Sequence, residues 1–256
     1  MRLIVALLAA TEVAAAAPRP LAEARQLVVV TTAGWSEATG RLQRFARRRS
    51  GEPWAAVGRP VAVVVGRRGL AWGRGLHDAP QQTSRLSTDA AVQRDSAAPQ
   101  KKEGDGAAPA GLFRLGPAFG RAPRIATALP YRPLTPATRC VDDAASRRYN
   151  QLVEERPGRA EWASAEAMHE LYVQGAVIAH NWERPVAGAG SCIFLHPWVD
   201  GRQGTAGCTA MADADLAALL AWLDARRGPL LLQLPGDEYA RRRRRWSLPD
   251  LAAPTE

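Results

Sequence analysis

The chain has 256 residues, 46% hydrophobic and 23% charged, which is enough to bury the core of one large domain or two small ones. Its 34 basic and 25 acidic residues give a net charge of +9, which excludes an acidic, disordered chain. The charge does not by itself indicate a nucleic-acid binder. Net charge bears on association rather than on fold, and nearly all of the basic residues are arginine in an alanine-rich chain.

The N-terminus has the order of a secretory signal. Arg2 precedes an apolar run over 3–10, and small residues over 14–17 end before Pro18. The run is too short to span a bilayer, and Glu12 follows it closely. We therefore expect residues 1–17 to be a signal peptide and the protein to be periplasmic or otherwise exported to the cell envelope. A frayed cytosolic N-terminus is the alternative.

Strands dominate the structure that the pattern predicts after the leader. β-branched runs at 26–32 and 60–66 indicate buried strands. Residues 78–100 contain almost no large apolar side chains and have no sustained period, so they predict a long surface loop. Beyond this loop we expect a helix at 160–172 and further strands at 111–115, 175–181, 191–196 and 229–234.

A second helix is predicted near the C-terminus. Its leucines recur at i, i+3, i+4 and i+7, and two aspartates suit its first turn; the residues are Leu216, Leu219, Leu220, Leu223, Asp213 and Asp215. Many strands, few helices and no regular alternation of the two argue against a doubly wound nucleotide-binding fold. The expected class is mainly β with a few helices (α+β), with a domain at 26–239 and a basic C-terminal tail at 240–256.

The three cysteines are Cys140, Cys192 and Cys208. An odd number in an exported protein suggests one disulfide and one remaining thiol, and the count alone does not say which cysteine remains. A zinc site formed by Cys192, His196 and Cys208 is an alternative, but it lacks the usual paired spacing and a clear fourth ligand.

His196 and Cys208 form a candidate base and nucleophile. His196 ends an apolar strand, and Cys208 follows a glycine-rich turn just ahead of the predicted helix. An adjacent imidazole and a helix N-terminus both favour the reactive thiolate. Gly207 would let a substrate approach closely, and the N–H groups around Cys208 could form an oxyanion hole. A buried structural cysteine beside a histidine is the alternative.

Four segments carry a resemblance to a known family. Residues 191–196 (SCIFLH) and 205–209 (TAGCT) resemble the active-site signature of the L,D-transpeptidases with a YkuD-type catalytic domain, in which a histidine precedes an [ST]-x-G-C segment. Residues 108–113 (APAGLF) resemble the T-P-x-G-x-F strand of that family, and 26–77 resemble the N-terminal part of a bacterial subgroup. The resemblance covers most of 26–239 and implies a β-sandwich catalytic domain.

The resemblance also implies a thiol enzyme acting on peptidoglycan stem peptides. Cys208 would attack the carbonyl between the diamino acid at position three and the D-alanine at position four, releasing D-alanine. An acceptor amine would then form a 3-3 cross-link, or water would hydrolyse the acyl-enzyme. His196 would be the general base and acid, with its ring oriented by the backbone carbonyl of Pro197. No metal or dissociable cofactor is implied.

The substrate-binding residues depart from the family pattern. The family commonly has S-H-G-C with an arginine two places after the cysteine, whereas this chain has Ala206 and Ala210. Substrate contacts are still expected from Thr205, Ala206 and Thr209. His180 could face the cleft as a further polar group or be a hydrogen-bonded structural histidine. The two alanines also leave open a non-catalytic peptidoglycan-binding protein with a degenerate site.

Once the resemblance assigns Cys208 to catalysis, Cys140 and Cys192 remain as the candidate disulfide pair. Such a bond would close a loop of roughly 50 residues and stabilise the fold by about 4 kcal/mol in the chain-entropy model. Two unpaired, buried thiols are the alternative.

The strongest local charge feature is a run of five arginines followed by Trp246: Arg241, Arg242, Arg243, Arg244 and Arg245. In an exported protein such a run could contact anionic envelope polymer or lipid, or it could be a solvated tail. No recognised nucleic-acid motif accompanies it, and no nucleic-acid partner is expected.

Overall fold

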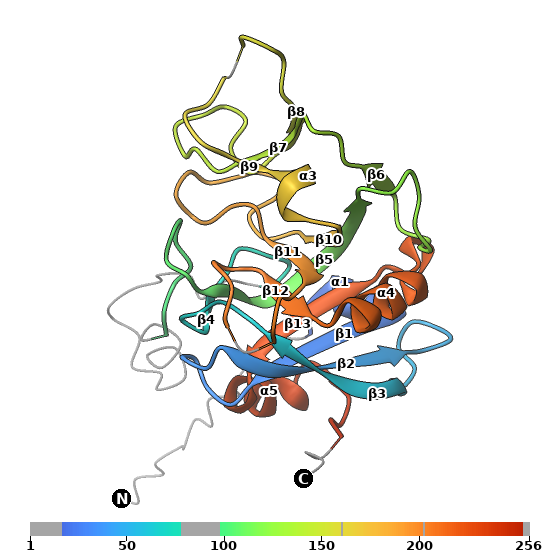
Figure 1. Cartoon of the computed structure of the whole chain (residues 1–256). Coiled ribbons are helices and arrows are strands. Elements are labelled where there is room, and N and C mark those ends of the chain that lie inside the picture. Colours follow the sequence, from blue (N-terminus) through green and yellow to red (C-terminus); the bar gives the residue numbers. More distant parts are fainter. Residues whose placement is uncertain (1–16, 78–97, 160, 202, 253–256) are drawn as a thin grey trace, which may run out of the picture.

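A computed structural model describes residues 17–77, 98–159, 161–201 and 203–252 (Figure 1). In chain order the elements are α1 (Arg19–Glu23), β1 (Gln26–Thr32), β2 (Thr39–Ala46), β3 (Ala55–Val64), β4 (Leu70–Trp72), β5 (Ala108–Gly120), β6 (Tyr131–Pro133), β7 (Thr138–Val141), β8 (Leu152–Glu154), β9 (Ala165–Ala167), α3 (Met168–Leu171), β10 (Gln174–Ile178), β11 (Phe194–Pro197), β12 (Thr209–Met211), α4 (Asp213–Trp222), the 3₁₀ turn η1 (Ala225–Arg227), β13 (Leu230–Pro235) and α5 (Gly236–Arg243). The predicted signal peptide, apart from residue 17, and the predicted loop, apart from residues 98–100, lie outside the described residues.

Ten strands form one sheet in the order β10-β11-β12-β3-β2-β1-β13-β5-β4, with β6 beside β5. β10 also pairs with β5, so the path of strand pairings returns to the strand where it began. A separate three-stranded sheet, β8-β7-β9, lies at the top of the molecule in Figure 1. The mainly β class is confirmed, whereas this arrangement does not confirm the expected sandwich.

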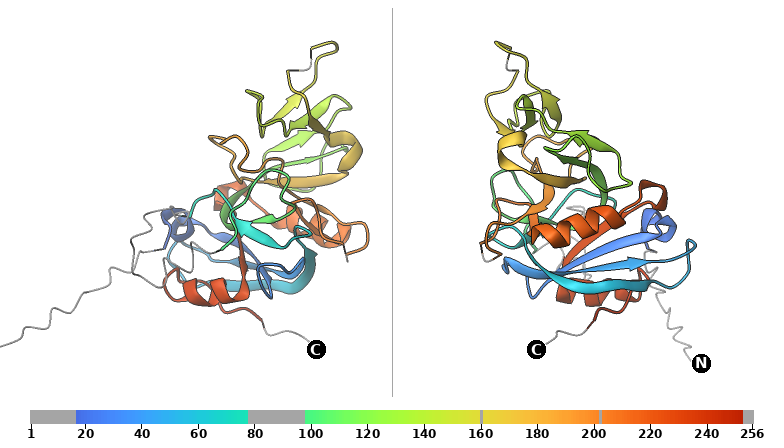
Figure 2. Two further views of the ribbon diagram at one scale, coloured as in Figure 1. Left: turned by 90° about the vertical axis from the view of Figure 1, so that its left-hand side faces the viewer. Right: turned by 45° about the vertical axis from the view of Figure 1, so that its right-hand side comes forward.

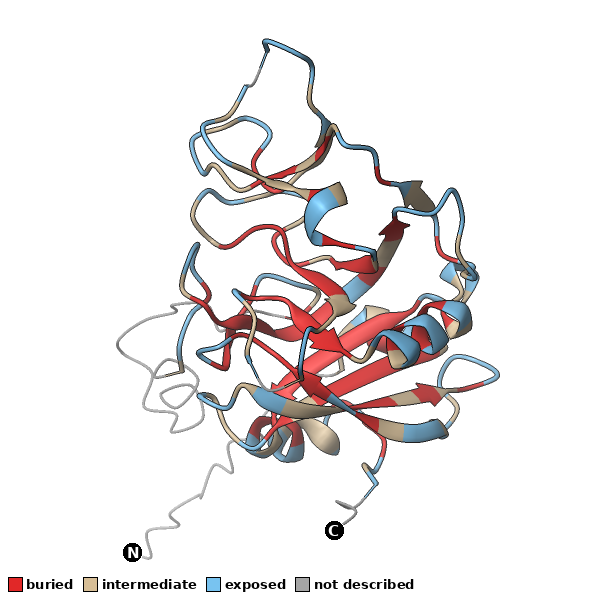
Figure 3. Cartoon of the chain, viewed as in Figure 1, coloured by how far each residue is buried: buried red, intermediate tan, exposed pale blue. Residues whose placement is uncertain are grey.

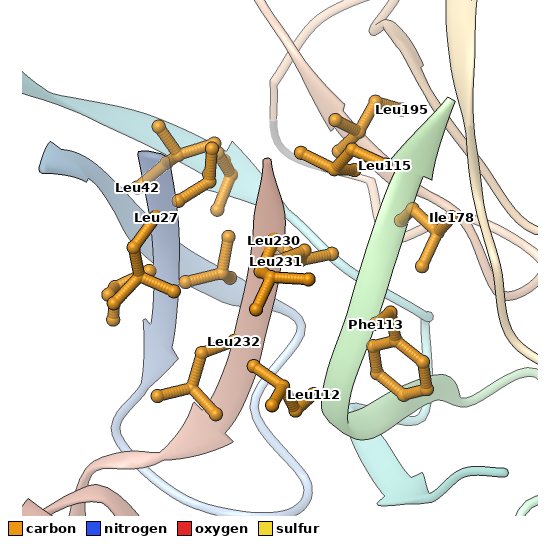
Figure 4. Close-up of a cluster of buried hydrophobic side chains, with 14 of the residues drawn as sticks. Leu27, Leu42, Leu112, Phe113, Leu115, Ile178, Leu195, Leu230, Leu231 and Leu232 are labelled. Carbon is orange, nitrogen blue, oxygen red and sulfur yellow. The ribbon is translucent and has the colours of Figure 1, made fainter. Parts of the chain in front are cut away.

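The centre of the large sheet is built from the apolar runs that the sequence shows. β1 pairs in parallel with β13 and antiparallel with β2, and both β1 and β13 are buried along nearly their whole length. Strands buried on both faces read as continuous apolar runs. Leu27 of β1, Leu230 and Leu232 of β13, and Leu112 of β5 belong to one cluster (Figure 4). Burying each of these side chains contributes about 1.5–3 kcal/mol.

The predicted C-terminal helix is confirmed as α4. Leu216, Leu219 and Leu220 are buried, and the helix contacts β10 and β11. Asp213 and Asp215 lie in its first turn, where a negative charge interacts favourably with the helix dipole. α5 contacts β1 and β13 instead, and Figure 2 shows the two helices on different parts of the sheet. Among the described residues, none of the helices is long and apolar enough to cross a bilayer.

The helix predicted at 160–172 is wrong. The described residues of this segment form the short strand β9 and the four-residue helix α3. β9 pairs with β7 through Arg139 and Ala167, Cys140 and Glu166, and Val141 and Ala165. The strand partner supplies backbone hydrogen bonds that outweigh the helix preference of this alanine- and glutamate-rich segment.

The predicted basic tail at 240–256 also needs correction. α5 runs to Arg243, and Trp246 and Leu248 are buried against the main core. The hydroxyl of Tyr239 donates to the carbonyl of Pro249 at 2.7 Å. Figure 3 shows the buried residues concentrated in the central strands, and this C-terminal segment packs on the same body. Residues 240–252 are therefore part of the folded domain.

Candidate active site

The register of two parallel strands brings the predicted nucleophile and base together. β11 pairs with β12 so that His196 lies opposite Ala210 and Leu195 opposite Thr209. Side chains opposite each other share a face of the sheet, and alternate residues return to it. Cys208, two residues before Ala210, therefore lies on the same face as His196. Both side chains line one pocket of about 660 Å³.

The His196 ring is held in one tautomer. Its Nδ1 lies 2.8 Å from the carbonyl oxygen of Pro197, which can only accept a hydrogen bond, so Nδ1 carries the proton. The other ring nitrogen, Nε2, is then left as a proton acceptor. Burial lowers the pKa of His196, and the Pro197 carbonyl partly opposes that shift. The resting ring is therefore neutral and suited to accept a proton.

Cys208 is a free, buried thiol. The backbone N–H of Phe194 donates to its sulfur at 3.3 Å, and its S–H donates to the carbonyl of Cys192 at 3.5 Å. Burial, together with the smaller effect of the nearby charge of Glu166, raises the pKa of Cys208 to about 12. The resting sulfur is therefore protonated, and forming the thiolate requires a proton acceptor.

The turn before Cys208 is held by one hydroxyl. Oγ of Thr205 donates to the carbonyl of Cys208 at 2.6 Å and accepts from the N–H of Gly207 at 3.1 Å. A Cβ at Gly207 would lie 3.2 Å from the carbonyl oxygen of Ala107, so glycine suits this close packing. Thr205, Ala206 and Gly207 all line the pocket with Cys208.

Two predicted substrate contacts lie elsewhere. Thr209 faces away from the pocket, where its fully buried hydroxyl donates to Gln233 at 2.7 Å. His180 is also buried outside the pocket: its Nδ1 accepts from the N–H of Arg74 at 3.1 Å, and its Nε2 lies 2.9 Å from the carbonyl of Ala189. Thr209 points to the opposite face from Cys208 and Ala210, because side chains alternate along a strand. His180 is a hydrogen-bonded structural histidine, which was the second of its two predicted roles.

Cys140 and Cys192 form a disulfide with an S–S distance of 2.08 Å. The bond joins β7 of the small sheet to the segment that leads into β11. Cys192 has a φ of +55°, a left-handed backbone that ends the extended conformation, so β11 begins at Phe194 and not at the predicted residue 191. The alternative zinc site required the sulfur of Cys192 as a ligand, and that sulfur is bonded to Cys140 instead. Among the described residues, no group of three or more potential ligands could hold a metal ion.

Other pocket residues were not predicted from the sequence. Glu166 of β9 and Tyr172, at the end of α3, line the pocket beside Cys208, and Lys101 and Glu103 approach it from the segment before β5. Lys101 is buried and pairs with Asp105 at 2.6 Å. No motif marks these residues, because they come from segments that are distant in the chain and are joined only by the fold.

The fold and pocket together define a mainly β domain with an imidazole on β11 and a thiol directly before the neighbouring parallel strand β12. A family model for the YkuD L,D-transpeptidase catalytic domain matches residues 40–237. This match covers well over half of the chain, so the protein belongs to that family, whose members are cysteine-dependent transpeptidases that act on peptidoglycan. The family resemblance of the two motifs is thereby confirmed. No curated protein and no solved structure matches the chain.

The arginine run is partly engaged within the chain. Arg241 and Arg242 pair with Glu238, and Arg243 pairs with Asp250. The Arg242 guanidinium also lies over the Trp72 ring, 4.8 Å from its centroid. The predicted envelope contact stays a prediction, and these ion pairs give three of its five arginines a structural role.

Proposed function

We propose that this protein is an exported cysteine L,D-transpeptidase acting on peptidoglycan stem peptides. The observation that carries the proposal is the placement of Cys208 and His196 on one face of β11 and β12, in one pocket, with the imidazole held by Pro197. Export is supported by the leader-like residues 1–17 and by the disulfide, because disulfides persist in oxidising compartments.

The proposed reaction begins with proton transfer from Cys208 to Nε2 of His196. The thiolate attacks the carbonyl between the diamino acid and D-alanine, and the resulting oxyanion is met by the backbone N–H of Cys208. When the C–N bond breaks, the D-alanine amine takes the proton from His196 and a thioester remains. An acceptor amine, or water, then attacks the thioester, His196 removes its proton, and the cysteine is released.

Burial shapes this chemistry. The pocket holds Cys208 as a thiol, which keeps the sulfur unreactive until a substrate covers the site. Thiolate formation then depends on the neutral His196 as acceptor and on donors already aimed at the sulfur, such as the N–H of Phe194.

The first experiment is intact mass spectrometry after incubation with a carbapenem, a class that acylates the cysteine of this family. We expect one covalent adduct on the wild-type protein and none on Cys208→Ala. His180→Gln is the matched control, because His180 lies outside the pocket, and it should keep the adduct. Absence of an adduct on the wild type, or an adduct retained by Cys208→Ala, contradicts the assignment of Cys208 as nucleophile.

Defined muropeptides then separate the possible reactions. Release of D-alanine with a cross-linked product indicates transpeptidation, and release with a shortened monomer indicates L,D-carboxypeptidase activity. Ala206 and Ala210, both in the pocket, support a second candidate, a non-catalytic peptidoglycan-binding protein. That candidate predicts peptidoglycan pull-down undiminished by Cys208→Ala and no release of D-alanine.

A further inference from the structure

Tyr172 connects three groups of the pocket. Its hydroxyl donates to Oε2 of Glu166 at 2.8 Å, and Tyr172 shares one buried cluster and one pocket with Cys208. Burial, and then the interaction of the hydroxyl with Cys208, raises the pKa of Tyr172. Its ring meets the His196 ring edge-on, with centroids 5.2 Å apart. One side chain therefore contacts the proposed nucleophile, the proposed base and a carboxyl group.

The position of the Tyr172 ring is fixed by packing. It makes edge-on contacts with Phe119 and Phe194, at centroid distances of 5.9 and 5.3 Å, in addition to His196. Tyr172, Phe119 and Phe194 belong to one buried cluster with Cys208, and Phe194 is also the residue whose N–H reaches the sulfur. The hydroxyl is thereby held between Glu166 and Cys208, and what remains variable is the direction of its hydrogen.

A phenol has one hydrogen to donate. When Glu166 is ionised, its carboxylate competes with the sulfur for that hydrogen and repels a negative charge on Cys208. When Glu166 is protonated, it can donate to the Tyr172 oxygen, and Tyr172 then donates to the sulfur. The second arrangement favours the thiolate both by removing a charge and by supplying a hydrogen bond.

We propose that Glu166 is a positioning residue that controls formation of the Cys208 thiolate by directing the hydroxyl hydrogen of Tyr172 either to its own carboxylate or to the sulfur. The proton that leaves Cys208 goes to Nε2 of His196, and the proton that neutralises Glu166 comes from solvent through the pocket. The inference rests on the proposed function of Cys208 as nucleophile.

The surroundings of Glu166 suit such a switch. The pKa of Glu166 is raised to about 7, mainly by burial; the hydrogen bond from Tyr172 lowers it, and the charges of Asp142 and Glu103 raise it. Lys101 and His196 face Cys208 in the same pocket. Both protonation states of Glu166 are therefore populated near neutral pH.

The test is the rate at which iodoacetamide alkylates Cys208, followed by intact mass spectrometry from pH 5 to 10. This reagent is neutral and needs no peptidoglycan, so the result does not depend on whether the proposed enzymatic activity is found. We expect Glu166→Gln to alkylate about tenfold faster than wild type at pH 8, which corresponds to a fall of about one unit in the pKa of Cys208. Tyr172→Phe should alkylate more slowly than wild type.

The double variant tests the relay itself. Glu166→Gln should raise the alkylation rate much less when Tyr172 is absent. In the Tyr172→Phe background we expect less than a third of the increase that Glu166→Gln gives when Tyr172 is present. An equal gain in both backgrounds shows a simple charge effect and overturns the relay, as does an unchanged rate in Glu166→Gln. If Tyr172→Phe does not fold, the pH profile decides: the wild-type rate divided by the hydroxide concentration must fall as Glu166 ionises, and that fall must be absent in Glu166→Gln.

Asp142→Asn is the matched control. Asp142 lines the same pocket and carries the same charge, but it makes no hydrogen bond to Tyr172 among the described contacts. Its removal should lower the pKa of Glu166 and so favour the ionised carboxylate. We expect no increase in alkylation for Asp142→Asn. A gain equal to that of Glu166→Gln overturns the proposal.

Discussion

His180 illustrates at the residue scale how burial sets protonation in this fold. Its ring is almost fully enclosed, accepts from Arg74 and lies beside the carbonyl of Ala189. Burial lowers the pKa of His180 to about 3, while the Ala189 carbonyl partly opposes the shift. The ring is neutral at all moderate pH values and braces the backbone outside the pocket.

This shift predicts a pH dependence of stability. The pKa of His180 is about 3 in the folded state and about 6.5 in the unfolded chain, so between these values the unfolded state binds the extra proton. The contribution of His180 is fully present above pH 6.5 and is lost as pH falls toward 3, at up to about 1.4 kcal/mol per pH unit. His180→Gln should flatten this part of the curve in urea unfolding. Equal slopes for the two proteins would contradict the prediction.

Single residues show what the sequence could and could not predict about the site. Cys208 and His196 follow from a motif whose members are close in the chain. Glu166 and Tyr172 carry no such spacing and reach the pocket only because β9 pairs with β7. Thr209 was misplaced because the motif gives its position in the chain but not its side of the strand.

At the element scale, the turn over 205–208 depends on the Thr205 hydroxyl. This hydroxyl is hydrogen-bonded to both the N–H of Gly207 and the carbonyl of Cys208, so it fixes the position of the Cys208 backbone. Because a single side chain makes both contacts, its role can be tested by substitution.

We expect Thr205→Val to reduce the rate of carbapenem acylation at Cys208 by about fivefold, since losing a hydrogen bond of about 1 kcal/mol frees the turn and misplaces the sulfur. The variant keeps the shape of threonine and removes only the hydroxyl. Thr205→Ser keeps the hydroxyl and should acylate at nearly the wild-type rate. The role of the turn is refuted when Val and Ser behave alike.

The elements differ in how well the sequence predicted them. β1 and β13 are continuous apolar runs, and their positions were predicted to within a residue or two. β5 extends over 13 residues where five were expected, because Gly111 and Gly116 look like turn residues yet adopt positive φ within the strand. β2 was missed because its apolar residues do not alternate regularly. Pairing with neighbouring strands stabilises β2 and β5 as strands although their local sequence patterns do not predict their full extent.

At the scale of the whole molecule, the Cys140–Cys192 disulfide ties the small sheet to the pocket. It spans 52 residues of sequence, which in the chain-entropy model corresponds to about 4 kcal/mol of stability. The double variant Cys140→Ser, Cys192→Ser should therefore unfold at a lower urea concentration. Reductant should move the wild-type midpoint to that of the variant and leave the variant unchanged. A wild-type midpoint insensitive to complete reduction would contradict this.

The C-terminal segment gives a second prediction at this scale. A chain truncated after residue 239 loses Trp246 and Leu248, worth about 3–6 kcal/mol of burial. It also leaves the buried Glu238 without Arg241 and Arg242, and an unpaired buried charge is costly. We expect this protein to be unfolded or rapidly proteolysed, and a chain truncated after residue 252 to melt as the full chain does. A folded short form would show that the segment is dispensable.

The parallel pairing of β1 with β13 has a consequence for how the protein is made. Leu27 aligns with Leu230, so two strands that touch along their whole length lie some 200 residues apart in the chain. Contacts between residues so far apart in the chain form slowly, because the entropy of closing a long loop is lost before the contacts can stabilise the structure. During synthesis or export, β1 emerges well before β13. The edge of β1 that pairs with β13 therefore stays unpaired until nearly the whole chain has followed. The protein therefore has an extended period of vulnerability to aggregation, in which chaperones or rapid translocation would have the most influence on its yield.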